Sequence, residues 1–170
     1  MIFTIGHSTR PLAVFLDLLH AHGIRRLADV RTVPRSKRHP HFAGEALEQS
    51  LAEAGIEYRH FPGLGGLRKP RADSQNSAWR VEGFRGYADY METDAFRNAL
   101  DALLAFAIVP TTVMCAEAVW WSCHRQLIAD ALVARAIGVR HIMSASAAEP
   151  HVLTAFAKVN GTDVRYPGLV

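Results

Sequence analysis

The sequence predicts a single α/β domain with three layers, in which a mostly parallel sheet is flanked by helices on both faces. Two observations carry this prediction. Short apolar segments alternate along the chain with segments whose apolar residues recur at helical spacing, an order typical of parallel sheets. Nearly half of the 170 residues are hydrophobic, which is enough for one sizeable core. We therefore treat residues 1–170 as one domain.

Six segments have the apolar or β-branched composition of strands. Five are expected in the sheet, and the sixth is a candidate edge strand near the C-terminus. In chain order these segments are residues 3–5, 27–30, 56–60, 111–115, 140–143 and 164–166. Their lengths are ordinary for strands of a small domain.

Helical spacing of leucine, phenylalanine and alanine residues predicts helices between these strands. The first helix carries Pro11 in its first turn and ends at Gly23, positions that suit both residue types. The others are expected at residues 44–54, 87–91, 95–106, 122–137 and 149–158. The polar segment 67–86 has no periodicity, and so long a loop in a compact domain is usually functional or mobile.

Residues capable of chemistry gather directly after the predicted strands. In a parallel sheet the carboxyl ends of the strands meet at one edge, and ligands bind there. The candidates at this edge are His7, Ser8, Asp29, Arg31, Gly65, Gly66, Cys115 and Glu117. We therefore expect a binding cleft beyond the carboxyl ends of the strands.

Several of these stretches together resemble a known bacterial family. They are, in chain order, residues 4–8 (TIGHS), 29–31 (DVR), 64–66 (LGG), 84–91 (FRGYADYM) and the stretch from Cys115-x-Glu117 to Cys123-His124-Arg125. In this order they resemble the family catalogued as domain of unknown function 488. The likeness covers about residues 2–143, with a helix and an edge strand expected in residues 149–170. The family has no settled activity, so the resemblance implies a fold class and a choice of residues but no reaction.

Cys123 is the strongest candidate for a reactive group. It lies near the start of a predicted helix, beside His124 and Arg125, where the helix dipole and neighbouring cations favour the thiolate. A thiol of this kind can be a nucleophile, a redox group or a metal ligand. The alternative is a small buried residue that packs the start of the helix.

Cys115 ends an apolar strand and is expected in the core. If both thiols face one cleft, they could form a reversible disulfide or share a metal. Seven residues separate them, which fits neither the C-x-x-C redox motif nor a common zinc knuckle. We therefore predict no metal site, and the sequence identifies no cofactor.

Acidic and basic residues at the strand ends suggest how a substrate could be held. Asp29 and Glu117 are candidates for acid–base or nucleophilic roles, with His7 as a further catalytic candidate. Arg31 and Arg125 could hold a phosphate or carboxylate group. The alternative is an ion pair, Asp29 with Arg125 or Glu117 with Arg31, that only closes the cleft. Ligand contacts are also expected from Ser8, Gly65, Gly66, His124 and Trp121.

These residues favour an enzyme that acts on a small anionic substrate, either nucleotide-like or phosphorylated. The spacing around the cysteines excludes a Cys-x5-Arg phosphatase loop, and the glycines form neither a Walker A loop nor a dinucleotide fingerprint. The alternative is a nucleic-acid-binding module, because basic residues cluster at 25–41 and 59–71 although the net charge is only +3. No apolar run could span a membrane, and two cysteines without an export signal predict a cytoplasmic protein. The oligomeric state cannot be read from the sequence.

Overall fold

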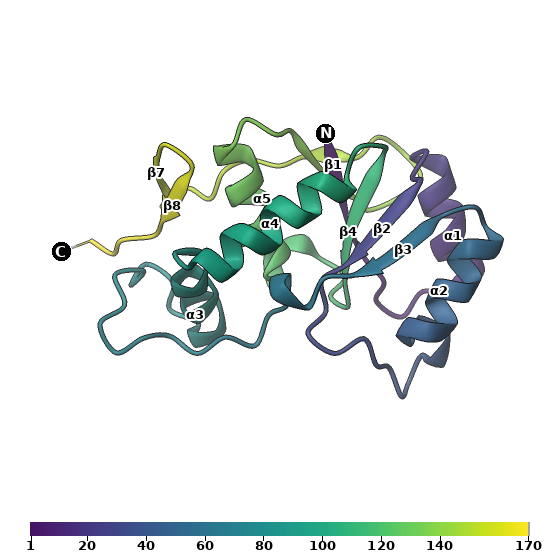
Figure 1. Cartoon of the computed structure of the whole chain (residues 1–170), viewed down its shortest axis with the longest axis horizontal. Coiled ribbons are helices and arrows are strands. Elements are labelled where there is room, and N and C mark those ends of the chain that lie inside the picture. Colours follow the sequence, from purple (N-terminus) through teal and green to yellow (C-terminus); the bar gives the residue numbers. More distant parts are fainter. Residues whose placement is uncertain (170) are drawn as a thin grey trace.

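A computed structural model, which describes residues 1–169, confirms the α/β fold class (Figure 1). Its main sheet has six strands in the order β3-β2-β4-β1-β5-β6. In chain order the strands are β1 (Ile2–Gly6), β2 (Arg26–Asp29), β3 (Glu57–His60), β4 (Thr111–Cys115), β5 (Val139–Ile142) and β6 (Glu149–Pro150). The first five run parallel, and β6 pairs antiparallel with β5.

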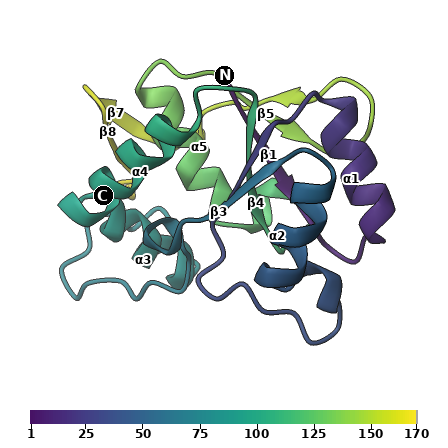
Figure 2. The ribbon, with the colours of Figure 1, turned by 45° about the vertical axis from the view of Figure 1, so that its right-hand side comes forward.

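Helices cover both faces of this sheet (Figure 2). On one face lie α1 (Leu12–Ala21) and α2 (Gly44–Glu53), and on the other lie α3 (Glu82–Met91), α4 (Asp94–Phe106) and α5 (Arg125–Ala134). Two separate apolar clusters result, because successive strand residues point to opposite faces. In the central strand β4, Val113 packs into the cluster beneath α3, α4 and α5, and Met114 packs into the cluster beneath α1 and α2. All five residues of β4 are buried, as expected of a strand covered on both faces.

The predicted helix at residues 149–158 is wrong. Its first two residues form β6, and its last residue begins β7 (Lys158–Asn160), which pairs with β8 (Asp163–Arg165) in a separate two-stranded sheet. The physical reason is that tertiary hydrogen bonds replace helical ones. The backbone amide of His151 donates to Val139, and that of Thr154 donates to the Asp130 carboxylate. The predicted edge strand at 164–166 therefore exists as β8, but it belongs to this hairpin and not to the main sheet.

Two other predicted helices have different starts. The helix expected at 122–137 begins at Arg125 and ends at Ala134, and the short 3₁₀ turn η3 (Trp120–Ser122) precedes it. The helix expected at 87–91 begins five residues earlier, at Glu82. Among residues 1–169, no helix combines the length and the apolar character needed to cross a membrane.

Gly6 ends β1 at a point where the chain has no room for a side chain. A Cβ atom there would overlap the backbone carbonyl of Glu117 and would lie 3.0 Å from Nη2 of Arg125. We predict that Gly6→Ala lowers the free energy of unfolding by about 1–3 kcal/mol, because the obstacle is backbone and cannot rotate away. Urea denaturation measures this. Gly83→Ala is the matched control, since nothing lies within 4 Å of its added Cβ, and an equal loss in both variants would contradict the prediction.

Candidate functional site

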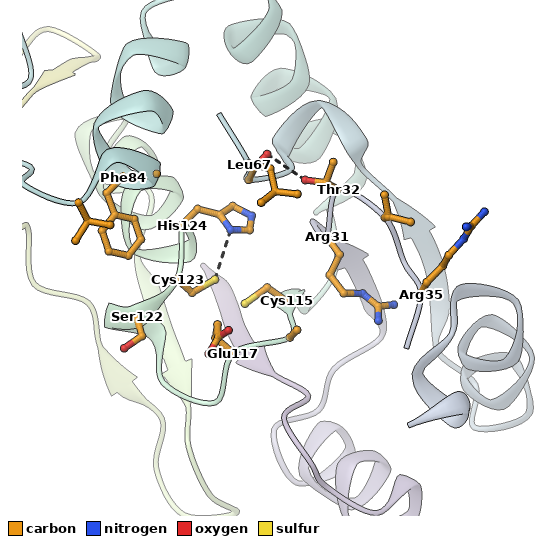
Figure 3. Close-up of a pocket in the computed structure, with 15 residues that line it drawn as sticks. Arg31, Thr32, Arg35, Leu67, Phe84, Cys115, Glu117, Ser122, Cys123 and His124 are labelled. Carbon is orange, nitrogen blue, oxygen red and sulfur yellow. Dashed lines mark hydrogen bonds between the residues drawn. The ribbon is translucent and has the colours of Figure 1, made fainter. Parts of the chain in front are cut away.

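A pocket of about 510 Å³ opens beyond the carboxyl ends of β2 and β4, beside the start of α5 (Figure 3). Four stretches of chain form its walls: the segment after β2, the glycine turn, the start of α3 and the β4–α5 connection. The residues that line it are Arg31, Thr32, Val33, Arg35, Gly66, Leu67, Val81, Gly83, Phe84, Cys115, Ala116, Glu117, Ser122, Cys123 and His124. The pocket therefore lies at the edge of the sheet where a cleft is expected from the sequence.

Both cysteines lie in the wall of this pocket. Cys115 is the last residue of β4, and Cys123 follows η3, two residues before α5 begins. Both are free thiols, only 2% and 4% exposed, and their side chains lie close enough for each to shift the pKa of the other. Figure 3 shows the two sulfur atoms facing one another. Cys115 is thus buried in the core, as expected, and it also lines the pocket.

The start of α5 directs further polar groups at the sulfur of Cys123. The backbone amide of Arg125 donates to it over 3.4 Å, and Nδ1 of His124 lies 3.5 Å away. Nε2 of His124 lies 3.0 Å from the carbonyl oxygen of Val30, which can only accept, so Nε2 carries a hydrogen. The same bond leaves Nδ1 to receive the proton of Cys123. The imidazole is therefore held in the orientation and tautomer of a base for this thiol.

The two thiols have opposite pKa shifts. Burial by itself raises the pKa of Cys123, but the hydrogen bonds from Cys115 and His124 and the charges of His124 and Arg125 hold it well below its usual value. Burial raises the pKa of Cys115 well above its usual value, and its hydrogen bond to Cys123 raises it further. These opposite shifts favour the negative charge on Cys123 and the proton on Cys115.

Arg125 is a buried cation without a carboxylate partner. Its side chain is only 1% exposed, and it forms no ion pair within residues 1–169. Nη2 donates to the backbone carbonyl of Glu117 over 2.6 Å, whereas Nε has no hydrogen-bond partner. Arg125 therefore fixes the loop after β4 and places a positive charge behind Cys123. The ion pair between Asp29 and Arg125 that the sequence left open is absent.

Asp29 pairs instead with its near neighbour Arg31. The carboxylate is fully buried and accepts from Nη2 of Arg31 over 2.6 Å, from Nε over 2.9 Å and from the Tyr58 hydroxyl over 2.8 Å. Nη1 of Arg31 lies 3.4 Å from Nε2 of His7, whose Nδ1 donates to the Ser8 carbonyl. Arg31 lines the pocket, and Asp29, His7 and Ser8 do not. These three residues are thus placed to orient Arg31.

A second buried histidine lies in a hydrogen-bonded chain behind the pocket. The Thr4 hydroxyl lies 2.6 Å from Nδ1 of His141, and Nε2 of His141 lies 2.9 Å from Nδ1 of His151. His151 in turn bonds the Asp130 carboxylate over 2.8 Å. The ring of Trp120 stacks on His141 with centroids 4.4 Å apart. If each group donates to the next, from the Thr4 hydroxyl to the Asp130 carboxylate, every hydrogen bond of this chain has one donor and one acceptor with both histidines neutral.

We predict that the protein becomes less stable as pH falls below about 6.5. Burial lowers the pKa of His7 to about 4 and that of His141 to about 3, from an ordinary value of 6.5. Below that value the unfolded chain takes up protons that the native histidines do not, so the free energy of unfolding decreases until the folded pKa values are reached. Urea denaturation at about pH 7.5 and about pH 5 measures the change. His7→Gln should reduce the difference in the free energy of unfolding between the two pH values, and the exposed His20→Gln should not. Equal differences in the two variants would contradict the prediction.

The remaining predicted residues divide between the pocket and its surroundings. Glu117, exposed, and Gly66 line the pocket. Gly65 lies behind it, where an added Cβ would meet Thr32. Trp121 is exposed and is not among the lining residues. Within residues 1–169, no group of three or more His, Cys, Asp or Glu side chains is arranged to hold a metal ion.

Sequence reasoning did not identify the apolar wall of the pocket. Val33, Leu67 and Val81 lie on segments without periodicity, so no pattern marked them. Phe84 lies within one of the stretches that carry the family resemblance, which was the one available signal. Arg35 was only one of several basic residues in the cluster 25–41.

Comparison with known proteins identifies a family. A family model described as "Domain of unknown function DUF488" matches residues 11–132. No curated protein and no solved structure matches the chain.

Proposed function

Because the chain belongs to the DUF488 family, whose description names no reaction, we propose a function from the pocket itself. In this proposal the protein is an enzyme that acts on a small anionic substrate, nucleotide-like or phosphorylated, with Cys123 as its nucleophile. The observation that carries it is the arrangement around Cys123. Its sulfur lies beside Cys115 and 3.5 Å from Nδ1 of His124, and it accepts from the backbone amide of Arg125 over 3.4 Å. A buried thiolate held in this way at a pocket wall is a common form of activated nucleophile.

Two arginines support an anionic substrate. Arg31 is fixed by Asp29 and lines the pocket. Arg35 also lines it, and its exposed guanidinium, which points away from the two cysteines in Figure 3, forms no ion pair among the described residues. Guanidinium groups bind phosphate and carboxylate oxygens through paired hydrogen bonds. Glu117 lies on the same pocket and is assigned the acid–base role. Asp29 and His7 act through Arg31 as positioning residues.

The test compares two alkylating reagents of similar size, anionic iodoacetate and neutral iodoacetamide. We expect the rate ratio of iodoacetate to iodoacetamide to be several-fold higher at Cys123 than for free cysteine, because the arginines attract the anion. Arg35→Gln should lower this ratio, and inorganic phosphate should slow both reagents by competition. Arg38→Gln is the matched control, since Arg38 is exposed and does not line the pocket. A ratio equal to or below that of free cysteine would overturn the proposal that the substrate is anionic.

A second function, nucleic-acid binding, is favoured by one observation. Arg35, Lys37 and Arg38 are exposed, and none forms an ion pair within the part of the chain that the structure describes. The basic residues of the other cluster are largely engaged: the guanidinium of Arg68 lies 3.7 Å from the ring centroid of Tyr90, and Arg71 bonds Glu92. If this function holds, DNA binding should weaken steeply as the salt concentration rises. Neutralising these three side chains should make this salt dependence less steep. Absence of binding at low salt would exclude it.

A further inference from the structure

The pocket holds a second thiol that a single nucleophile does not require. We propose that the pocket reduces an organic hydroperoxide, with Cys123 as the attacking thiol and Cys115 as the thiol that closes a disulfide with it. This rests on the proposed function only in taking Cys123 as a nucleophile. It adds a role for Cys115, a class of reaction and the apolar part of the substrate.

The geometry brings the two sulfurs together, and part of the chain between them can adjust. Cys115 is fixed at the end of the central strand, where its carbonyl accepts from the backbone amide of His7 over 2.9 Å. Figure 3 shows the two side chains facing each other, and each lies close enough to shift the pKa of the other. A disulfide needs a sulfur–sulfur distance of about 2 Å. The carbonyls of Ala116 and Glu117 are held by Ser8 and Arg125, whereas residues 118–122 are exposed or half-buried, so this part of the connection can take up the shift.

The two thiols are prepared for different steps. Cys123 is the thiolate, the form that attacks peroxide oxygen, and it lies against the cationic start of α5. Cys115 keeps its proton because of burial and its bond to Cys123. It therefore does not compete for the peroxide, and it lies beside the sulfur that becomes oxidised.

The reaction balances in three steps. First, the Cys123 thiolate attacks the terminal oxygen of ROOH; the O–O bond breaks, and the departing alkoxide takes a proton, giving ROH and Cys123 sulfenic acid. Second, the Cys115 sulfur attacks the sulfenic sulfur; the S–OH bond breaks, and the thiol proton leaves with hydroxide as water. Third, an external dithiol reduces the disulfide by exchange and is itself oxidised to a disulfide.

The rim of the pocket indicates the organic part of the substrate. Val33, Leu67 and Val81 are 53%, 89% and 60% exposed, and all three line the pocket beside Phe84. Exposed apolar side chains that surround a buried thiolate are stabilised when an apolar group covers them. Hydrogen peroxide has no such group. The pocket should therefore prefer a hydroperoxide with an apolar organic part.

The test treats the reduced protein with cumene hydroperoxide or hydrogen peroxide and follows its mass and its sulfenic acid, trapped with dimedone. We expect the wild type to lose two hydrogens through a Cys115–Cys123 disulfide, at least several-fold faster with cumene hydroperoxide. Dithiothreitol should restore the starting mass. In Cys115→Ser, sulfenic acid should accumulate at Cys123 without a disulfide, and Cys123→Ser should form neither product. Val81→Thr, which keeps the side-chain shape, should lower the preference for cumene hydroperoxide.

Two outcomes would overturn this inference. One is stable sulfenic or sulfinic acid at Cys123 of the wild type with no disulfide, and the other is faster oxidation by hydrogen peroxide than by cumene hydroperoxide. Either result, with Cys123 still readily alkylated by iodoacetate, would leave the proposed function standing. Loss of both alkylation and oxidation at Cys123 would overturn both, and circular dichroism of each variant shows that the fold is intact.

Discussion

Replacing Asp29 with asparagine is expected to lower the free energy of unfolding by about 3–5 kcal/mol, the cost typical of breaking a buried ion pair. The carboxylate is fully buried and bonds two nitrogen atoms of the Arg31 side chain and the Tyr58 hydroxyl. An amide cannot neutralise the guanidinium, so a buried cation would remain without its partner. Chemical denaturation measures the loss.

Glu57→Gln is the matched control for Asp29→Asn. Glu57 pairs with Arg26 over 2.7 Å, but its side chain is 47% exposed, so the loss should stay within about 1 kcal/mol. Tyr58→Phe removes one hydrogen bond to the Asp29 carboxylate and keeps the ion pair, with an expected loss of about 1.5–3 kcal/mol. This variant gives a measurable value even if Asp29→Asn does not fold. Equal losses in Asp29→Asn and Glu57→Gln would show that the buried pair contributes no more than a surface pair.

The second large effect is expected in the alkylation of the two cysteines. At neutral pH, iodoacetamide should label Cys123 at least about 10-fold faster than Cys115, because the pKa of Cys123 is held well below its usual value and that of Cys115 is raised well above it. The rate at Cys123 should level off at a lower pH than that of free cysteine, whereas the rate at Cys115 should still rise with pH there. Peptide mapping by mass spectrometry separates the two sites.

Two histidine variants test the cause of this reactivity. His124→Gln removes the ring that lies 3.5 Å from the Cys123 sulfur, so the pH at which Cys123 becomes reactive should rise. His20→Gln should leave it unchanged, because His20 is exposed and bonds the Ala54 carbonyl. If both cysteines react alike, and only at alkaline pH, Cys123 is not activated.

Much of the fold could be predicted because burial leaves periodic patterns in the sequence. The central strand β4 is a continuous apolar or β-branched run, and α4 carries Phe96, Leu100 and Leu103 on one face. The rule that ligands bind at the carboxyl ends of parallel strands then indicates where Cys115 and Glu117 should lie. These predictions need only local pattern and one topological rule.

The parts that could not be predicted depend on contacts between distant segments. Hydrogen bonds to Asp130 and Val139 hold residues 151–154 out of the helix that their composition suggests. Asp29 bonds Arg31, two residues away, whereas the ion pair considered from the sequence joined Asp29 to Arg125. Pocket walls such as Leu67 lie on loops that carry no periodicity. Which side chains pair with each other, and what shape a loop takes, depends on the folded chain and not on the local sequence.

The unpaired charge of Arg125 has a consequence for the oxidised protein. In the reduced state its buried guanidinium is close enough to lower the pKa of Cys123, and negative charge on that sulfur partly compensates the cation. A disulfide would be neutral and would leave the cation uncompensated, so this environment stabilises the dithiol form more than the oxidised form. Stabilisation of the reduced form makes a disulfide easier to reduce and a stronger oxidant. A Cys115–Cys123 bond would therefore be a labile disulfide that exchanges with cellular thiols and not a permanent cross-link.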